Sequence, residues 1–161
     1  MSAVEAGLRG HSWPIVAVLA ACTVAVHGGQ LGTHPVMNAH FDEHRFPVAA
    51  ANYLTSNYLK ENHLPDPILA PDYWGGYLIY RLYPETHVVV DDRHDLYGEQ
   101  FFKSYLNMIR VERDWAGIMK EHSTRCIMVP RTSALANMLL QAPDWQPIYT
   151  DEVAIVFMPR T

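Results

Sequence analysis

Apolar residues follow two different periodicities along the chain after residue 46. Apolar positions three and four residues apart predict helices over residues 47–62, 74–83, 97–110, 114–122 and 133–141. Short apolar runs predict buried strands at 67–70, 86–90 and 125–129, and a hairpin of strands at 145–150 and 153–159. Strands that alternate with helices in this order predict an α/β fold. We expect a three-layer sandwich with a mainly parallel sheet and a C-terminal antiparallel hairpin, preceded by one N-terminal apolar helix.

The N-terminal apolar run, residues 13–26, carries no charged side chain. It is shorter than the ~20 apolar residues that cross a bilayer, so a membrane helix, a cleaved signal peptide and a buried helix all remain open. We expect a membrane helix and connector over residues 1–33 and an extracytoplasmic α/β domain over residues 34–161. Arg9 before the run, and Asp42 and Glu43 after it, favour a cytoplasmic N-terminus and a domain in the periplasm of a bacterium.

Composition excludes several classes of function. The chain has 161 residues, enough for one domain with a core, and a net charge of −5 without any cluster of basic residues. Nucleic acid is therefore not expected as a partner, since phosphate binding needs clustered Lys and Arg. Cys22 and Cys126 form neither a zinc pattern nor an expected disulfide. The dinucleotide fingerprint and the nucleophile elbow are both absent from the sequence, and no cofactor is expected.

The first candidate site follows the predicted strand 67–70 and consists of Tyr73, Trp74, Gly75 and Gly76. Two adjacent glycines let a ligand approach the backbone closely, and a helix that begins there would favour an anion. The aromatic rings of Tyr73 and Trp74 could stack on a sugar. The alternative is a tight strand-to-helix turn with Trp74 in the core, which needs no ligand.

The second candidate site is a charged cluster that follows the predicted strand 86–90 and contains Asp91, Arg93 and Asp95. Ligands of open α/β sheets bind beyond the carboxyl ends of the strands, so this is a suitable position for a site. Arg93 could hold a phosphate or carboxylate, and the carboxylates could hold a divalent cation. The alternative is a structural ion pair between Asp91 and Arg93, with Asp95 capping the next helix. If the two strands are neighbours, both candidate sets lie at one edge of the sheet.

A metal site is a further possibility near the start of the predicted domain. His40, Asp42, Glu43 and His44 are residue types that bind zinc, but their order is not that of the known helical zinc motif. Many tyrosines also lie between residues 53 and 105, which favours either amphipathic packing or an aromatic sugar groove.

The motifs that follow the first predicted helix carry a resemblance to a known family. They are Phe46-Pro47, Trp74-Gly75-Gly76-Tyr77-Leu78-Ile79, Leu82-Tyr83-Pro84, Val90-Asp91, Arg93, Asp95 and Tyr97-Gly98. The region from Phe46 to Phe157 resembles the C-terminal extracytoplasmic domain of bacterial multi-spanning, GT-C-type glycosyltransferase-like membrane proteins, of the dolichyl-phosphate-mannose and aminoarabinose transferase kind. The Trp-Gly-Gly-Tyr-Leu block and the later Asp-x-Arg are its most specific parts.

The resemblance implies a membrane-anchored, periplasmic accessory domain at the bacterial inner membrane that is not catalytic by itself. The implied partners are membrane lipid, a multi-spanning membrane unit and a lipid-linked sugar. In such families the catalytic acid follows the first membrane helix, a region with no counterpart here. Oligosaccharyltransferases carry a Trp-Trp-Asp-Tyr-Gly block that binds the acceptor, but residues 72–76 have a different order. The resemblance therefore does not imply that this chain recognises an acceptor. The alternative function is a secreted or periplasmic module that binds a small ligand or a metal.

Overall fold

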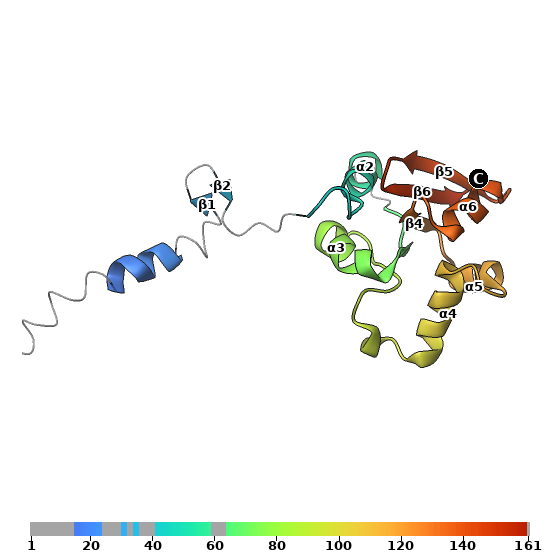
Figure 1. The fold of residues 1–161 in the computed structure, drawn as a ribbon, viewed down its shortest axis with the longest axis horizontal. Coiled ribbons are helices and arrows are strands. Elements are labelled where there is room, and N and C mark those ends of the chain that lie inside the picture. The colour runs from blue at the N-terminus through green and yellow to red at the C-terminus, as the bar shows by residue number, and fades with distance from the viewer. Residues whose placement is uncertain (1–14, 24–29, 32–33, 36–40, 59–63, 161) are drawn as a thin grey trace, which may run out of the picture. The chain divides into compact units, whose positions relative to one another are not determined.

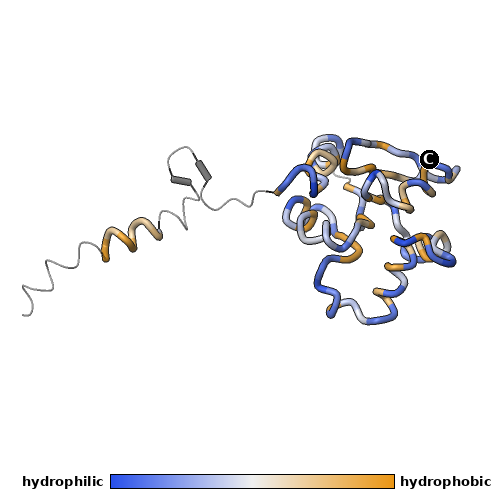
Figure 2. The backbone as a smooth tube through the Cα atoms, viewed as in Figure 1, coloured by the Kyte–Doolittle hydropathy of each residue, from blue (hydrophilic) through white to orange (hydrophobic). Residues whose placement is uncertain are grey.

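The computed structural model describes residues 15–23, 30–31, 34–35, 41–58 and 64–160, and it divides the chain into two units, residues 1–40 and 41–161. In the first unit, residues 15–23 form an exposed helix of hydrophobic residues (Figure 2). Strand β1 (Gln30–Leu31) pairs in antiparallel fashion with β2 (His34–Pro35). Among the described residues, no helix is both long enough and apolar enough to cross a bilayer. The expected membrane helix at residues 13–26 is therefore not supported, and both its ends lie outside the described residues.

The second unit contains a four-stranded sheet in the order β3-β4-β6-β5, with helices packed around it (Figure 1). Its elements in chain order are α2 (Val48–Tyr58), β3 (Ile68–Leu69), α3 (Asp72–Leu82), the short 3-10 helix η2 (His94–Leu96), α4 (Glu99–Ile109), α5 (Trp115–Glu121), β4 (Cys126–Pro130), α6 (Ala134–Gln141), β5 (Trp145–Thr150) and β6 (Ala154–Pro159). The mixed α/β class and the positions of the predicted helices agree with the sequence pattern.

The sheet is mixed, so the prediction of a mainly parallel sheet is wrong. Strands β3 and β4 are parallel, with Ile68 opposite Cys126. Strand β6 lies between β4 and β5 and is antiparallel to both. The predicted C-terminal hairpin is confirmed. Its second strand pairs directly with β4 and does not stay at the edge, which makes two of the three strand pairings antiparallel.

The strand predicted at residues 86–90 is absent from the described structure, where this segment makes a single parallel bridge between Val88 and Ile68. The bridge has two hydrogen bonds, from Ile68 N to His87 O (2.8 Å) and from Val89 N to Ile68 O (3.0 Å). Its partner β3 is only two residues long and lies between Pro67 and Pro71, which have no N–H to donate. The β-branched residues of this segment therefore have no longer neighbouring strand with which to form further hydrogen bonds.

Alternate residues of the strands point into two separate cores, one on each face of the sheet. One core contains strand residues Ile68, Cys126, Met128, Ala154 and Val156 with α2 and α3. The other contains Leu69, Ile127, Val129, Ile155 and Phe157 with α4, α5 and α6. Helices therefore cover both faces, which explains why β4 reads as an unbroken apolar run and is buried along most of its length.

One helix cap and one turn form where their sequences favour them. The Ser133 hydroxyl accepts a hydrogen bond from Ala136 N (3.1 Å) and so caps α6. In the β5–β6 turn, Asp151 Oδ1 accepts hydrogen bonds from the N–H groups of Val153 and Ala154, both at 2.7 Å.

Helix α3 begins at Asp72, so Gly75 and Gly76 lie inside the helix, and the expectation that the chain enters the helix through them is wrong. The two glycines have different surroundings. A Cβ atom on Gly75 would lie 2.5 Å from Asp91 Cα and 2.6 Å from Val90 O, whereas one on Gly76 would meet no atom within 4 Å. Gly75 thus lets α3 pack directly on the backbone of residues 90–91.

We predict opposite effects of alanine at these two positions. Gly75→Ala should lower the free energy of unfolding by about 1–3 kcal/mol, because a methyl group would overlap with backbone atoms that cannot move aside. Gly76→Ala is the matched control on the same helix. It should raise the free energy of unfolding by about 0.5–1 kcal/mol, because alanine is more favourable than glycine at an exposed position inside a helix. Urea unfolding of both variants measures the difference. Equal effects at the two positions would contradict the packing described.

Candidate functional site

The first candidate set is divided between the core and the surface. Trp74 is 1% exposed, and its Nε1–H donates to Arg45 O (2.8 Å). Its ring therefore belongs to the core and offers no face to a ligand. Gly75 is buried against residues 90–91, while Gly76 is exposed. Tyr73, at 59% exposure, is the member of this set whose side chain is available at the surface.

In the second set, Asp91 and Arg93 form an ion pair. The Asp91 side chain is 2% exposed and accepts hydrogen bonds from Arg93 Nε (2.9 Å) and Nη2 (2.6 Å) at Oδ2, and from Arg93 N (3.0 Å) at Oδ1. These hydrogen bonds from Arg93 hold the pKa of Asp91 below its usual value, against the opposing effect of burial. The structural ion pair considered from the sequence is present. The Arg93 side chain is nevertheless 63% exposed, and its Nη1 has no partner among the described residues.

Tyr97 and Asp95 complete this segment. The Tyr97 hydroxyl accepts a hydrogen bond from Asp91 N (3.1 Å), which fixes the start of the 91–97 segment to its end. Burial raises the pKa of Tyr97, so the hydroxyl stays protonated. Asp95 lies in η2 with an exposed side chain and makes no hydrogen bond within the described part of the chain. Asp95 is the member of the second set that the fold leaves apart from the others.

The two candidate sets meet because the 86–90 segment and β3 are neighbours and run parallel. Besides the Gly75–Asp91 contact, His94 Nε2 lies 2.8 Å from Asp72 Oδ2. The Tyr105 hydroxyl on α4 donates to Ala70 O (3.2 Å) and accepts from Asp72 N (2.7 Å), and burial raises its pKa. Asp72, His94 and Tyr105 were not singled out in the sequence as site residues. The available signal for Asp72 was its position two residues after the predicted strand 67–70.

A cavity of about 220 Å³ opens beside the ion pair, and we refer to it as the Arg93 cavity. Ile79 and Val88 supply apolar contact, and Tyr83 is 64% exposed. The complete lining is Ile79, Tyr83, Thr86, His87, Val88, Asp91, Arg93 and Tyr97. Aromatic, hydroxyl and guanidinium groups beside these apolar side chains suit a small ring that carries hydroxyl or phosphate groups. The large number of tyrosines in the sequence was the signal for Tyr83 and Tyr97. No pattern in the sequence indicated His87.

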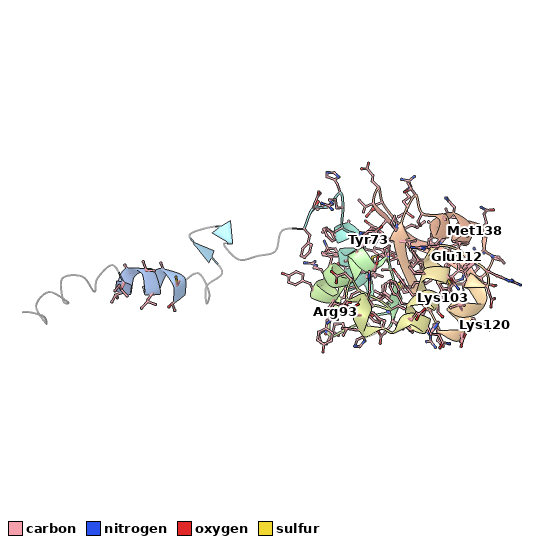
Figure 3. All side chains as sticks on the ribbon, turned by 60° about the horizontal axis from the view of Figure 1, so that its bottom comes forward. Tyr73, Arg93, Lys103, Glu112, Lys120 and Met138 are labelled. Carbon is pink, nitrogen blue, oxygen red and sulfur yellow. The ribbon has the colours of Figure 1, made fainter. Side chains whose placement is uncertain are left out.

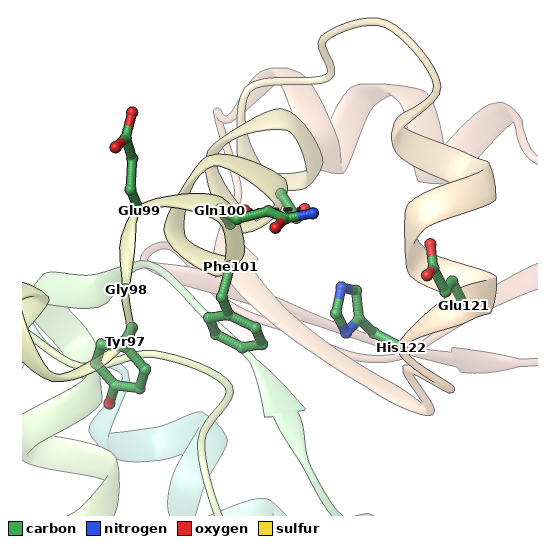
Figure 4. A pocket seen from close by; sticks show the side chains of 8 residues that line it. Tyr97, Gly98, Glu99, Gln100, Phe101, Glu121 and His122 are labelled. Atoms are coloured by element: carbon green, nitrogen blue, oxygen red, sulfur yellow. Dashed lines mark hydrogen bonds between the residues drawn. The ribbon is translucent and has the colours of Figure 1, made fainter.

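A larger and more open cavity, of about 540 Å³, lies between α4 and α5 (Figure 4). Its aromatic members are Tyr97, Phe101 and His122; the Tyr97 and Phe101 rings are stacked with centroids 5.9 Å apart, and His122 lies edge-on to Phe101. Glu99 and Glu121 lie at its rim. We assign the candidate site to the smaller Arg93 cavity, because that cavity contains two of the predicted residues and a fixed charged pair.

The proposed metal set is not assembled within the part of the chain that the structure describes. There, no three His, Cys, Asp or Glu side chains are placed to hold one ion. His40, which belongs to that set, lies outside the described residues.

Comparisons with known proteins identify the fold. No protein-family model matches the chain, and no curated protein matches its sequence. A solved structure, the C-terminal globular domain of an oligosaccharyltransferase from Archaeoglobus fulgidus, has a similar fold with a TM-score of 0.52 and 9% identity. The match covers 77% of this chain and 100% of that domain. At this identity the likeness shows the fold alone. It agrees with the resemblance to GT-C-type proteins at the level of the fold.

We predict that the Asp91–Arg93 pair makes stability depend on pH. Because the folded-state pKa of Asp91 is lowered, its contribution is complete above the unfolded aspartate value of ~3.9 and is lost as the pH falls through the lower folded value. Asp91→Asn should lower the free energy of unfolding by about 1–3 kcal/mol at pH 7, with a difference from wild type that narrows below about pH 4. Urea unfolding across pH 2–7 tests this.

Asp95→Asn provides the control for this experiment, because Asp95 is exposed and lies on the same segment. Its effect should stay within about 0.5 kcal/mol. A difference between Asp91→Asn and wild type that is the same at pH 7 and pH 2 would show that the ion pair does not contribute.

Proposed function

We propose that this chain is an accessory domain of a GT-C-type, lipid-linked-sugar glycosyltransferase-like membrane protein, without catalytic activity of its own. The single observation that supports this most is the fold, which matches the whole of an oligosaccharyltransferase C-terminal globular domain. The motif resemblance between Phe46 and Phe157 points independently to the same class of protein.

The Arg93 cavity is the site we propose for the lipid-linked sugar. The Arg93 guanidinium is held in place by Asp91, and its free Nη1 can donate to a phosphate or sugar oxygen. Since Asp91 already offsets the charge of Arg93, the cavity favours oxygen-rich rings over small, highly charged anions. The exposed Tyr83 ring can pack against the sugar face while its hydroxyl stays in water. Of the residues proposed from the sequence, Asp91 and Arg93 remain in this site, and Tyr73 lies outside its lining.

Membrane attachment belongs to the same proposal. The apolar residues 13–26 would anchor the chain in the bacterial inner membrane, with residues 34–161 in the periplasm beside a multi-spanning unit and membrane lipid. In this arrangement the domain would position a lipid-linked sugar, while another part of the assembly supplies the catalytic acid. No cofactor is needed for such a role.

We predict that Tyr83→Ala weakens the binding of a lipid-linked sugar. The full chain in detergent is titrated calorimetrically with a short-chain, water-soluble prenyl-phosphate sugar. Loss of ring stacking should weaken binding about fivefold to tenfold. Tyr80→Ala is the matched control: Tyr80 is an exposed tyrosine near the end of α3, three residues before Tyr83, and does not line the cavity, so this variant should bind as wild type does.

The same protein should produce no glycosyl transfer when it is incubated with the prenyl-phosphate sugar and an acceptor. Turnover by the purified chain would contradict the accessory role. Equal loss of affinity in Tyr83→Ala and Tyr80→Ala, or no binding by wild type, would remove the Arg93 cavity as the sugar site.

A further inference from the structure

A third cavity, of about 260 Å³, lies on the face of the sheet that α5 covers. Trp115 at the start of α5 and Trp145 at the start of β5 both line it, together with Lys120, Thr124 and Asp144. We call it the two-tryptophan cavity. It lies toward the β5 edge of the sheet, whereas the Arg93 cavity borders the segment beside β3 at the other edge. Figure 3 shows Lys120 and Arg93 far apart on the domain.

The two indole rings are available to a ligand. Trp115 and Trp145 are both partly exposed: each packs against the core that contains Met119 and Phe157 and keeps part of its surface accessible. Their Nε1–H groups also have no hydrogen-bond partner among the described residues. Trp74 differs in both respects, because it is buried and its Nε1–H donates to Arg45 O. Two part-exposed tryptophans, 30 positions apart in the sequence, therefore line one cavity with part of each ring accessible and with both indole N–H donors unpaired among the described residues.

The other polar groups of the cavity also lack partners in the described structure. Thr124 is 7% exposed, and its Oγ1 is buried without a hydrogen bond. The Lys120 ammonium and the Asp144 carboxylate make no ion pair among the described residues; Asp144 uses only its main-chain oxygen, which accepts from Arg160 N (2.8 Å). Thr124 Oγ1 is the buried polar atom of this lining, whereas Lys120 and Asp144 are exposed and lie at its open side. The Lys120 ammonium and the Asp144 carboxylate are accessible and unpaired in the described structure, so a ligand with several hydroxyl groups can bond to both.

Charge and size narrow the class of ligand. One positive and one negative side chain line the cavity, which favours a neutral ligand that both accepts from Lys120 and donates to Asp144. The volume is below the range that holds drug-sized molecules, so the cavity suits a single ring. Indole surfaces pack well against the C–H face of a sugar, while its hydroxyl groups point outward to polar side chains. We propose that the two-tryptophan cavity binds one neutral saccharide ring.

This assignment rests on the cavity alone and does not depend on the proposed function, which concerns the Arg93 cavity at the other edge of the sheet. If both are correct, the domain contacts sugars at two separate places. Failure of either leaves the other unaffected, because the two experiments use different probes and different variants.

The test uses the ¹⁵N-labelled full chain and methyl β-D-glucopyranoside, observed by NMR at the indole N–H signals. Saturable shifts are expected for Trp115 and Trp145, and none for Trp74, whose N–H is already bonded in the core. Lys120→Met should weaken the affinity about tenfold, because it removes a charged hydrogen-bond donor. Lys103→Met, an exposed lysine on α4 outside the cavity, is the matched control and should leave the affinity unchanged.

Cyclohexanol, a ring of the same size with one hydroxyl, separates sugar binding from apolar binding. If cyclohexanol shifts the same signals as strongly, the cavity takes apolar rings and the proposal is wrong. Absence of any shift with the glucoside, with methyl α-D-mannopyranoside and with methyl β-D-galactopyranoside would overturn it as well. Unchanged affinity in Lys120→Met, with thermal unfolding as for wild type, would also contradict the role of the polar lining.

Discussion

Helix α3 lies so close to the backbone of Val90 and Asp91 that residue 75 can carry no side chain. This contact fixes where the chain passes after the Val88 bridge, and therefore where Asp91 is buried. Asp91 in turn holds the Arg93 guanidinium. The arrangement of the Arg93 cavity thus depends on one glycine, which acts through close packing and not through contact with a ligand.

A guanidinium that is already paired has a specific consequence for recognition. Asp91 fixes two of the nitrogen atoms of Arg93, so little side-chain freedom is lost when the remaining one meets an oxygen atom. The pair also offsets most of the charge, so in the proposed role selectivity would come from the shape and hydroxyl groups of Tyr83 and Tyr97, which line the cavity. The cavity is therefore better suited to an uncharged or weakly charged ring than to free phosphate.

The sequence suggested where the candidate site lies better than which side chains line it. Asp91 and Arg93 were chosen as candidates because polar residues after an apolar run mark the end of a buried segment. They lie near the residues after β3 because the 86–90 segment runs parallel to β3. Trp74 was interpreted as a possible ligand contact, but its burial places it in the core. His87 and His94 were missed, since each pairs with an aspartate more than 20 residues away, Asp66 and Asp72, and carries no local signal.

Hydrophobic periodicity alone determined the mixed α/β class, the helices, β4 and the C-terminal hairpin, because each depends on contacts that recur locally along the chain. The partners of the strands were decided by the tertiary structure. The run at residues 86–90 is a β-branched apolar run typical of a strand. A strand needs a neighbour whose backbone groups can pair with it, and β3 ends at Leu69, two residues before Pro71. The placement of β6 beside β4, and with it the mixed sheet, likewise depends on how two faces bury their side chains together. No single segment of the sequence contains that information.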